Sequence, residues 1–149
     1  MRQTALWSFT FVLLSGSAAA QEASAPGEAY YYFCLGRMAE MQMQAETAAT
    51  HYREAIRLDP AAAYPHVALA ELYQRTRQVD KALESAKKAV ELGPEVAAAH
   101  RTLGEVYFSL LKNGGSPDLA PLAIQAYREA VRIDPGDVQT RSSLARLLL

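Results

Sequence analysis

Three segments of this 149-residue chain end in nearly the same way, and this repetition constrains the fold more than any other feature. The segments read YREAIRLDP up to Pro60, SAKKAVELGP up to Pro94 and YREAVRIDP up to Pro135. The first two prolines are 34 residues apart and the last two are 41 apart. A repeat of this length predicts a stack of small supersecondary units. Seven extra residues therefore belong to the third unit, and we expect the Gly- and Pro-containing segment 112–118 to hold them as a loop.

Each unit contains two stretches in which small and larger apolar residues recur at helical spacing. The second stretch of each unit ends before a proline, which disfavours helix in the preceding residue. The pattern predicts pairs of antiparallel helices that approach closely wherever Gly or Ala leaves room. In the first unit the recurring residues are Tyr32, Leu35, Gly36 and Ala39, then Ala48, Tyr52 and Ala55.

This pattern resembles the tetratricopeptide repeat family, with units over residues 29–62, 63–96 and 97–137 and a terminal helix over 138–149. The resemblance implies an all-α fold, a right-handed superhelical array (an α-solenoid) of antiparallel helix pairs with about three repeats and a C-terminal capping helix. Two departures are local. His66 and His100 stand where the family usually has an aromatic residue, and Ala86 replaces the aromatic of the second helix in the middle unit.

The first twenty residues have the features of a secretory signal peptide. Arg2 precedes an uncharged apolar run of about ten residues, half of what a membrane-spanning helix needs. Three alanines ending at Ala20 then favour cleavage after that residue. We expect residues 21–28 to form a flexible leader, and the protein to be exported, periplasmic or secreted, without stable membrane insertion after cleavage.

Composition and motifs argue against several classes of function. A net charge of −1 gives no basic field for nucleic acid. No catalytic motif or cofactor-binding loop is present in the sequence, so we expect neither enzymatic activity nor a cofactor. His66 and His100 are one period apart and could hold a metal, but no carboxylate or thiol completes the set, so packing is the favoured role. Cys34 is either a small residue on a helix face or a thiol that pairs with another chain.

The family resemblance implies that the first helices of successive pairs line a concave groove. Aromatic side chains and arginines on such a surface are suitable anchors for a partner. The lysines and asparagines with which one subgroup of the family grips the C-terminus of chaperones are missing here, which disfavours that ligand. The repeat phase predicts a groove formed by Tyr30, Phe33, Arg37, Tyr64, Val67, Glu71, Arg75, Arg101, Glu105 and Phe108.

The leading hypothesis is an exported, non-catalytic scaffold that binds a protein or peptide in this groove, in cell-envelope assembly or complex formation. An alternative is the N-terminal repeat module of a larger exported enzyme or assembly factor whose active domain lies beyond residue 149. Self-association of the array is also possible. The sequence ends on three leucines, which leaves open whether the chain is complete or the front of a longer array.

Overall fold

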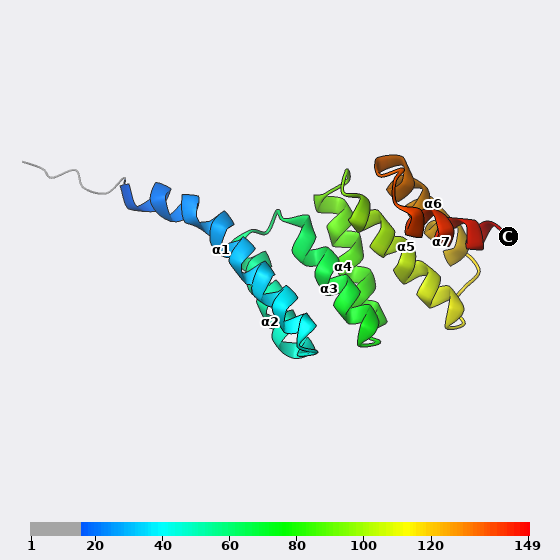
Figure 1. Cartoon of the computed structure of the whole chain (residues 1–149), viewed down its shortest axis with the longest axis horizontal. Coiled ribbons are helices and arrows are strands. Elements are labelled where there is room, and N and C mark those ends of the chain that lie inside the picture. The colour runs from blue at the N-terminus through cyan, green and yellow to red at the C-terminus, as the bar shows by residue number, and fades with distance from the viewer. Residues whose placement is uncertain (1–15) are drawn as a thin grey trace, which may run out of the picture.

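The computed structural model of the protein describes residues 16–149, which form seven α-helices and no strand. The helices follow one another across the molecule in chain order, and the beginning of α1 projects from one end (Figure 1). The expected all-α solenoid is therefore confirmed. Among the described helices, none combines the length and the hydropathy required to cross a membrane. The helices are α1 (Gly16–Met41), α2 (Ala45–Leu58), α3 (Ala63–Arg75), α4 (Val79–Leu92), α5 (Ala97–Lys112), α6 (Leu119–Ile133) and α7 (Val138–Leu148).

The helices pair as α1–α2, α3–α4 and α5–α6, and one kind of turn closes all three hairpins. In each turn one residue takes the left-handed backbone conformation that commonly ends a helix, with φ of 60° at Met43, 60° at Arg77 and 88° at Gly114. The following amide then donates back into the last turn of the first helix. These hydrogen bonds join Gln44 N to Ala39 O (2.9 Å), Gln78 N to Tyr73 O (2.8 Å) and Gly115 N to Leu110 O (3.0 Å).

The repeated prolines mark the passage from one hairpin to the next. The residue before each proline still donates its amide to a carbonyl four positions earlier, at 2.9 Å for Asp59, Gly93 and Asp134 alike. The proline that follows has no amide hydrogen, so the helix ends there. The chain then turns and starts the next helix within a few residues, which sets the spacing of the stack.

Two segments differ from the expected boundaries. Helix α5 continues to Lys112, three residues beyond Ser109, which stands one period after the end of α3 at Arg75. The insertion in the third unit therefore lengthens a helix as well as the turn after it. Helix α1 begins at Gly16, so segment 21–28 is helical where we expected a flexible leader; the alanines there favour helix. Residues 1–15, most of the predicted signal peptide, lie outside the described part.

A glycine facing a tyrosine fixes the distance between the helices of the first and third hairpins. Tyr52 of α2 is fully buried against Gly36 of α1, and Tyr127 of α6 is buried against Gly104 of α5. A Cβ atom added at Gly104 would lie 2.8 Å from Cδ1 of Tyr127, and one added at Gly36 would lie closer still to the Tyr52 ring.

In the middle hairpin, two small residues allow the same close approach of the helices. Ala70 and Ala86 stand at the positions of the glycine and the tyrosine, and both are fully buried. The two arrangements keep antiparallel helices close with different combinations of side-chain volume. The loss of the aromatic at Ala86 is thus compensated within the hairpin, by a methyl group at position 70.

We expect Gly36→Ala and Gly104→Ala each to destabilise the protein by about 1–3 kcal/mol, because the added methyl group overlaps a buried tyrosine ring. Alanine is otherwise the better helix former by about 1 kcal/mol. Gly27→Ala is the matched control, since Gly27 is also helical and no atom lies within 4 Å of its added Cβ. Thermal denaturation followed by circular dichroism should show this control unchanged or slightly stabilised. Equal effects at all three glycines would contradict the packing argument.

Candidate partner-binding groove

Charged side chains from α1, α3 and α5, and from the residue before α7, lie side by side across the helix array. They alternate in sign and join each helix to the next. We call this set the ion-pair row; it consists of Arg37, Glu40, Glu71, Arg75, Arg101, Glu105 and Asp137. Part of it lines a shallow groove of about 350 Å³ between α3, α5 and α7.

The row begins with two crossed contacts between α1 and α3. Nη1 of Arg37 lies 3.0 Å from Glu40 on its own helix and 3.7 Å from Glu71 on α3. Nη2 of Arg75 on α3 lies 2.8 Å from Oε1 of Glu40. The Glu40 side chain is only 7% exposed, so two guanidinium groups compensate a nearly buried carboxylate.

Arg101 continues the row from α3 to α7. Its guanidinium lies 3.8 Å from Glu71, 3.9 Å from Glu105 and 3.2 Å from Asp137. A single arginine therefore contacts three carboxylates from three segments of the array. Exposed single pairs contribute little to stability, whereas several charges that form a network can contribute more.

Asp137 is the best-held carboxylate of the row because it also caps α7. Its Oδ1 accepts a hydrogen bond from the amide of Thr140 at 3.0 Å, and its Oδ2 accepts one from the Thr140 hydroxyl at 2.6 Å. These two bonds, helped by Arg101, lower the pKa of Asp137 from 3.8 to about 2. Glu105 differs, since burial first, and then the nearby Glu71 and Asp137, raise its pKa despite Arg101.

The predicted aromatic residues meet at one end of the groove. Tyr30 and Phe33 of α1 and Tyr64 of α3 line a small cleft of about 230 Å³, where the ring centroids of Tyr30 and Phe33 are 6.4 Å apart. Tyr30 is 69% exposed and Tyr64 is 59% exposed, whereas Phe33 is half-buried against Tyr52. Asp59 is the charged residue that lines this cleft. We call this site the aromatic cleft.

Phe108 lies at the opposite end, in a polar hollow between α5 and α7. The ammonium group of Lys112 stands 5.6 Å from the centroid of the Phe108 ring, and Arg146 lines the same hollow. The predicted groove residues thus separate into an aromatic end, an ion-paired centre and a mixed polar end.

Val67 does not belong to the groove surface, and its assignment is corrected. It is 5% exposed and packs with Ala89 of α4 and Ala99 of α5. The repeat phase equates Val67 with Phe33 and Arg101. Because α5 packs directly against α3, the start of α5 covers this position.

Two members of the ion-pair row were missed by sequence reasoning. Glu40 follows Arg37 by three residues on one helix, a spacing at which side chains of opposite charge meet. Asp137 precedes α7 with Thr140 three residues later, which is the pattern of a helix cap. Both signals are local and could have been recognised, but neither shows that the residue reaches another helix.

The histidines and the cysteine form no site of their own. The Nε2 atom of His100 lies 2.8 Å from the carbonyl oxygen of Pro94, a contact within the turn before its helix. Cys34 is half-buried on α1 with a free thiol. Among the described residues, no three His, Cys, Asp or Glu side chains gather as a metal would require.

The stacked helical hairpins agree with the family and the solved structures that this sequence matches. A family model described as tetratricopeptide repeat matches residues 67–138. This segment therefore matches the tetratricopeptide repeat family, and the described chain has the fold of such domains. No curated protein matches it at a significant level.

Solved tetratricopeptide domains share the fold at low sequence identity. The first such domain of Spaghetti (RPAP3), bound to the HSP90 peptide SRMEEVD, has a TM-score of 0.74 and 19% identity, covering 83% of this chain and 92% of that one. The Arabidopsis OM64 domain has a TM-score of 0.73 and 20% identity over 83% and 97% of the two chains. The Sgt2 domain from Aspergillus fumigatus has a TM-score of 0.72 and 20% identity over 81% and 77%. At such identities the likeness shows the fold alone.

Replacement of Asp137 should separate its two roles. We expect Asp137→Ala to cost about 1 kcal/mol at neutral pH through loss of the cap, and Asp137→Asn to cost less because asparagine also caps helices. The folded-state pKa of Asp137 is depressed, so its charge stabilises the fold above pH 4, and this contribution is lost as the pH falls from about 4 to about 2. Urea titrations at pH 7, 4 and 2 should therefore show both variants converging on the parent at low pH. A difference that does not change with pH would contradict this assignment.

Proposed function

We propose that this tetratricopeptide domain is an exported, non-catalytic scaffold that binds an apolar or aromatic segment of a protein partner. The aromatic cleft is the anchoring site, and the binding serves the assembly of a complex in the cell envelope. The observation that carries the proposal is the exposure of Tyr30 and Tyr64 beside a preformed cleft, next to a groove whose charged side chains pair with one another.

Tyrosine suits this role because it buries a large area at a low entropic cost. The volume of the aromatic cleft is sufficient for one large apolar side chain of a partner. One oxygen of Asp59 accepts a hydrogen bond from the amide of Ala61 at 3.1 Å, and the carboxylate leaves negative charge at the cleft. A basic residue beside the apolar anchor of the partner is therefore favoured.

The central groove disfavours an acidic tail as ligand. Its four carboxylates and three guanidinium groups leave an excess of one negative charge. The positions that correspond to the chaperone-binding lysines and asparagines hold other residues in this chain, namely Phe33, Arg37, Val67, Glu71, Arg101 and Glu105. The peptide in the Spaghetti complex, SRMEEVD, carries three acidic residues, and we expect it not to bind here.

Selection of peptides on the purified protein tests the proposed anchor. We expect the selected peptides to share an apolar or aromatic residue, and Tyr30→Ala/Tyr64→Ala to weaken their binding at least about tenfold by fluorescence anisotropy. Tyr31→Ala is the matched control, because Tyr31 is 59% exposed on the same helix but does not line the cleft. If both variants weaken binding equally, or the selected peptides share only acidic residues, the aromatic cleft is not the anchor.

Export is tested by the mass of the protein in fractionated bacteria that express the full chain. We expect a periplasmic species with the mass of residues 21–149, because Ala18 and Ala20 present the small side chains that signal peptidase reads. Ala18→Leu/Ala20→Leu should leave the chain uncleaved. A full-length species that stays in the cytoplasm would refute export.

A further inference from the structure

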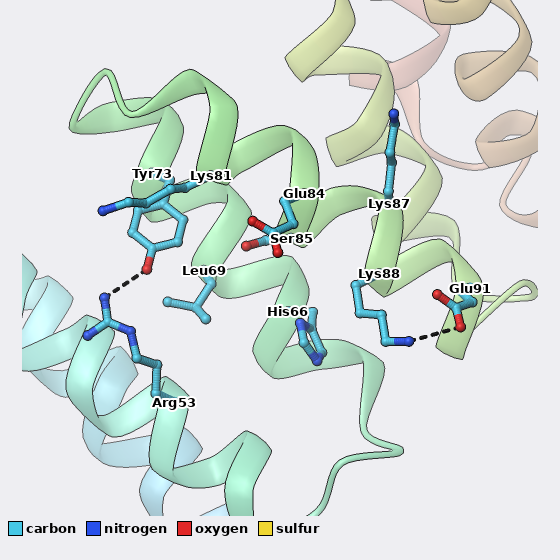
Figure 2. Close-up of a pocket in the computed structure, with 10 residues that line it drawn as sticks. All are labelled: Arg53, His66, Leu69, Tyr73, Lys81, Glu84, Ser85, Lys87, Lys88 and Glu91. Atoms are coloured by element: carbon cyan, nitrogen blue, oxygen red, sulfur yellow. Dashed lines mark hydrogen bonds and ion pairs between the residues drawn. The ribbon is translucent and has the colours of Figure 1, made fainter.

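A further hollow of the described part of the protein lies away from the groove. It is a cleft of about 740 Å³ whose two walls are α2 and α4 and whose floor is α3 (Figure 2). His66, Leu69 and Tyr73 form the floor, on the side of α3 opposite to Glu71 and Arg75 by helical periodicity. We call this site the convex cleft, because it opens on the other face of the array from the ion-pair row.

Two cations stand at one end of the convex cleft. Nη2 of Arg53 on α2 donates to the hydroxyl of Tyr73 at 2.8 Å, and this bond ties the wall to the floor (Figure 2). Nζ of Lys81 on α4 lies 5.6 Å from the centroid of the same ring and donates to Gln78 at 2.8 Å. The Tyr73 ring thus lies between two cations, and because Tyr73 is only 7% exposed, this end presents mainly their positive charge.

Lys88 and His66 mark the other end. The ammonium group of Lys88 lies 2.9 Å from Glu91, one turn further along α4 (Figure 2). His66 is half-buried, and burial, with Lys88 as the smaller cause, lowers its pKa, so its ring is neutral at pH 7. The neutral imidazole and the hydroxyl of Ser85 offer hydrogen bonds to a peptide backbone in the cleft.

The convex cleft differs from the groove in how its charged side chains are paired. Four cations and two carboxylates line it. Within the part of the chain whose side chains the structure describes, Arg53, Lys81 and Lys87 contact no carboxylate at ion-pair distance, whereas each arginine of the ion-pair row contacts at least one. Glu84 stands on the α4 wall between the two ends and restricts negative charge in a ligand to those ends.

The length of the floor limits the ligand. From His66 to Tyr73, α3 rises by about 10 Å, at 1.5 Å per residue. A peptide in the extended polyproline II conformation covers that distance in about three residues, at about 3.1 Å per residue, and its side chains three positions apart point to the same side. Two carboxylates that reach both ends of the cleft must therefore stand three positions apart, with apolar side chains between them above Leu69.

We propose that the convex cleft binds a short extended segment of a partner protein, in which two acidic residues three positions apart flank apolar ones. One carboxylate lies between Arg53 and Lys81, and the other lies at Lys88, where it replaces Glu91. This site is independent of the aromatic cleft, so the two proposals can fail separately. A partner with both kinds of segment would hold both faces of the array.

A synthetic peptide with the core Glu-Leu-Val-Glu between Gly-Ser flanks is the probe, titrated against the purified protein by fluorescence anisotropy. We expect saturable binding that weakens with added salt, and no binding of a Gln-Leu-Val-Gln core. Lys81→Gln/Lys88→Gln should weaken binding at least about tenfold. Lys112→Gln is the matched control, because this exposed lysine stands at the end of α5 outside the cleft. Circular dichroism verifies that each variant is folded.

Three results would overturn the proposal. Binding that is absent up to about 1 mM peptide means that the cleft has no useful affinity for the segment. Equal weakening by Lys112→Gln means that the attraction comes from general surface charge. Equal binding of a Glu-Gly-Gly-Glu core, or full competition by short polyphosphate at equal charge, means that the cleft is a general anion site rather than a peptide site.

Discussion

The close approach of the two helices within each hairpin is the contact on which the rest of the array depends. A glycine against a tyrosine, or an alanine against an alanine, brings the backbones together, and the buried ring or methyl groups fill the remaining space. Because each hairpin has a fixed thickness, the turns at the repeated prolines can place the next hairpin at a regular interval. The first helices then stand in a row, and the distances between their side chains follow from that spacing.

The spacing of the first helices determines which charged side chains can pair with one another. On one face, arginines and carboxylates of neighbouring helices find one another, and Arg101 holds three carboxylates from three segments. On the other face, within the described part of the chain, Arg53, Lys81 and Lys87 line a cleft without a carboxylate partner at ion-pair distance, whereas Lys88 pairs with Glu91. A chain with a net charge of −1 thus presents a face with compensated charge and a face with local positive charge. Recognition follows this local arrangement far more than the total charge.

The exposed aromatic residues distinguish one end of the groove from the other. Tyr30 and Tyr64 belong to different hairpins and meet because α1 and α3 are consecutive first helices. Single exposed rings are common on protein surfaces, but these rings together line a cleft that a partner side chain can fill. Next to the cleft, Arg37 and Arg75 contact carboxylates across the same two helices that carry the rings.

The sequence by itself determined the repeat, the helix pairs and the residue types that stand on the first helices, because periodic spacing, prolines and small residues act locally on the backbone. It also indicated that Tyr30, Phe33 and Tyr64 share a face. Only the tertiary structure decided that Val67 is covered by α5, that Glu40 and Asp137 join the ion-pair row, and that a cleft with more cations than carboxylates opens behind α3. These outcomes depend on how closely one hairpin packs on the next, and that distance is set by the summed volumes of side chains far apart in the sequence rather than by any local pattern.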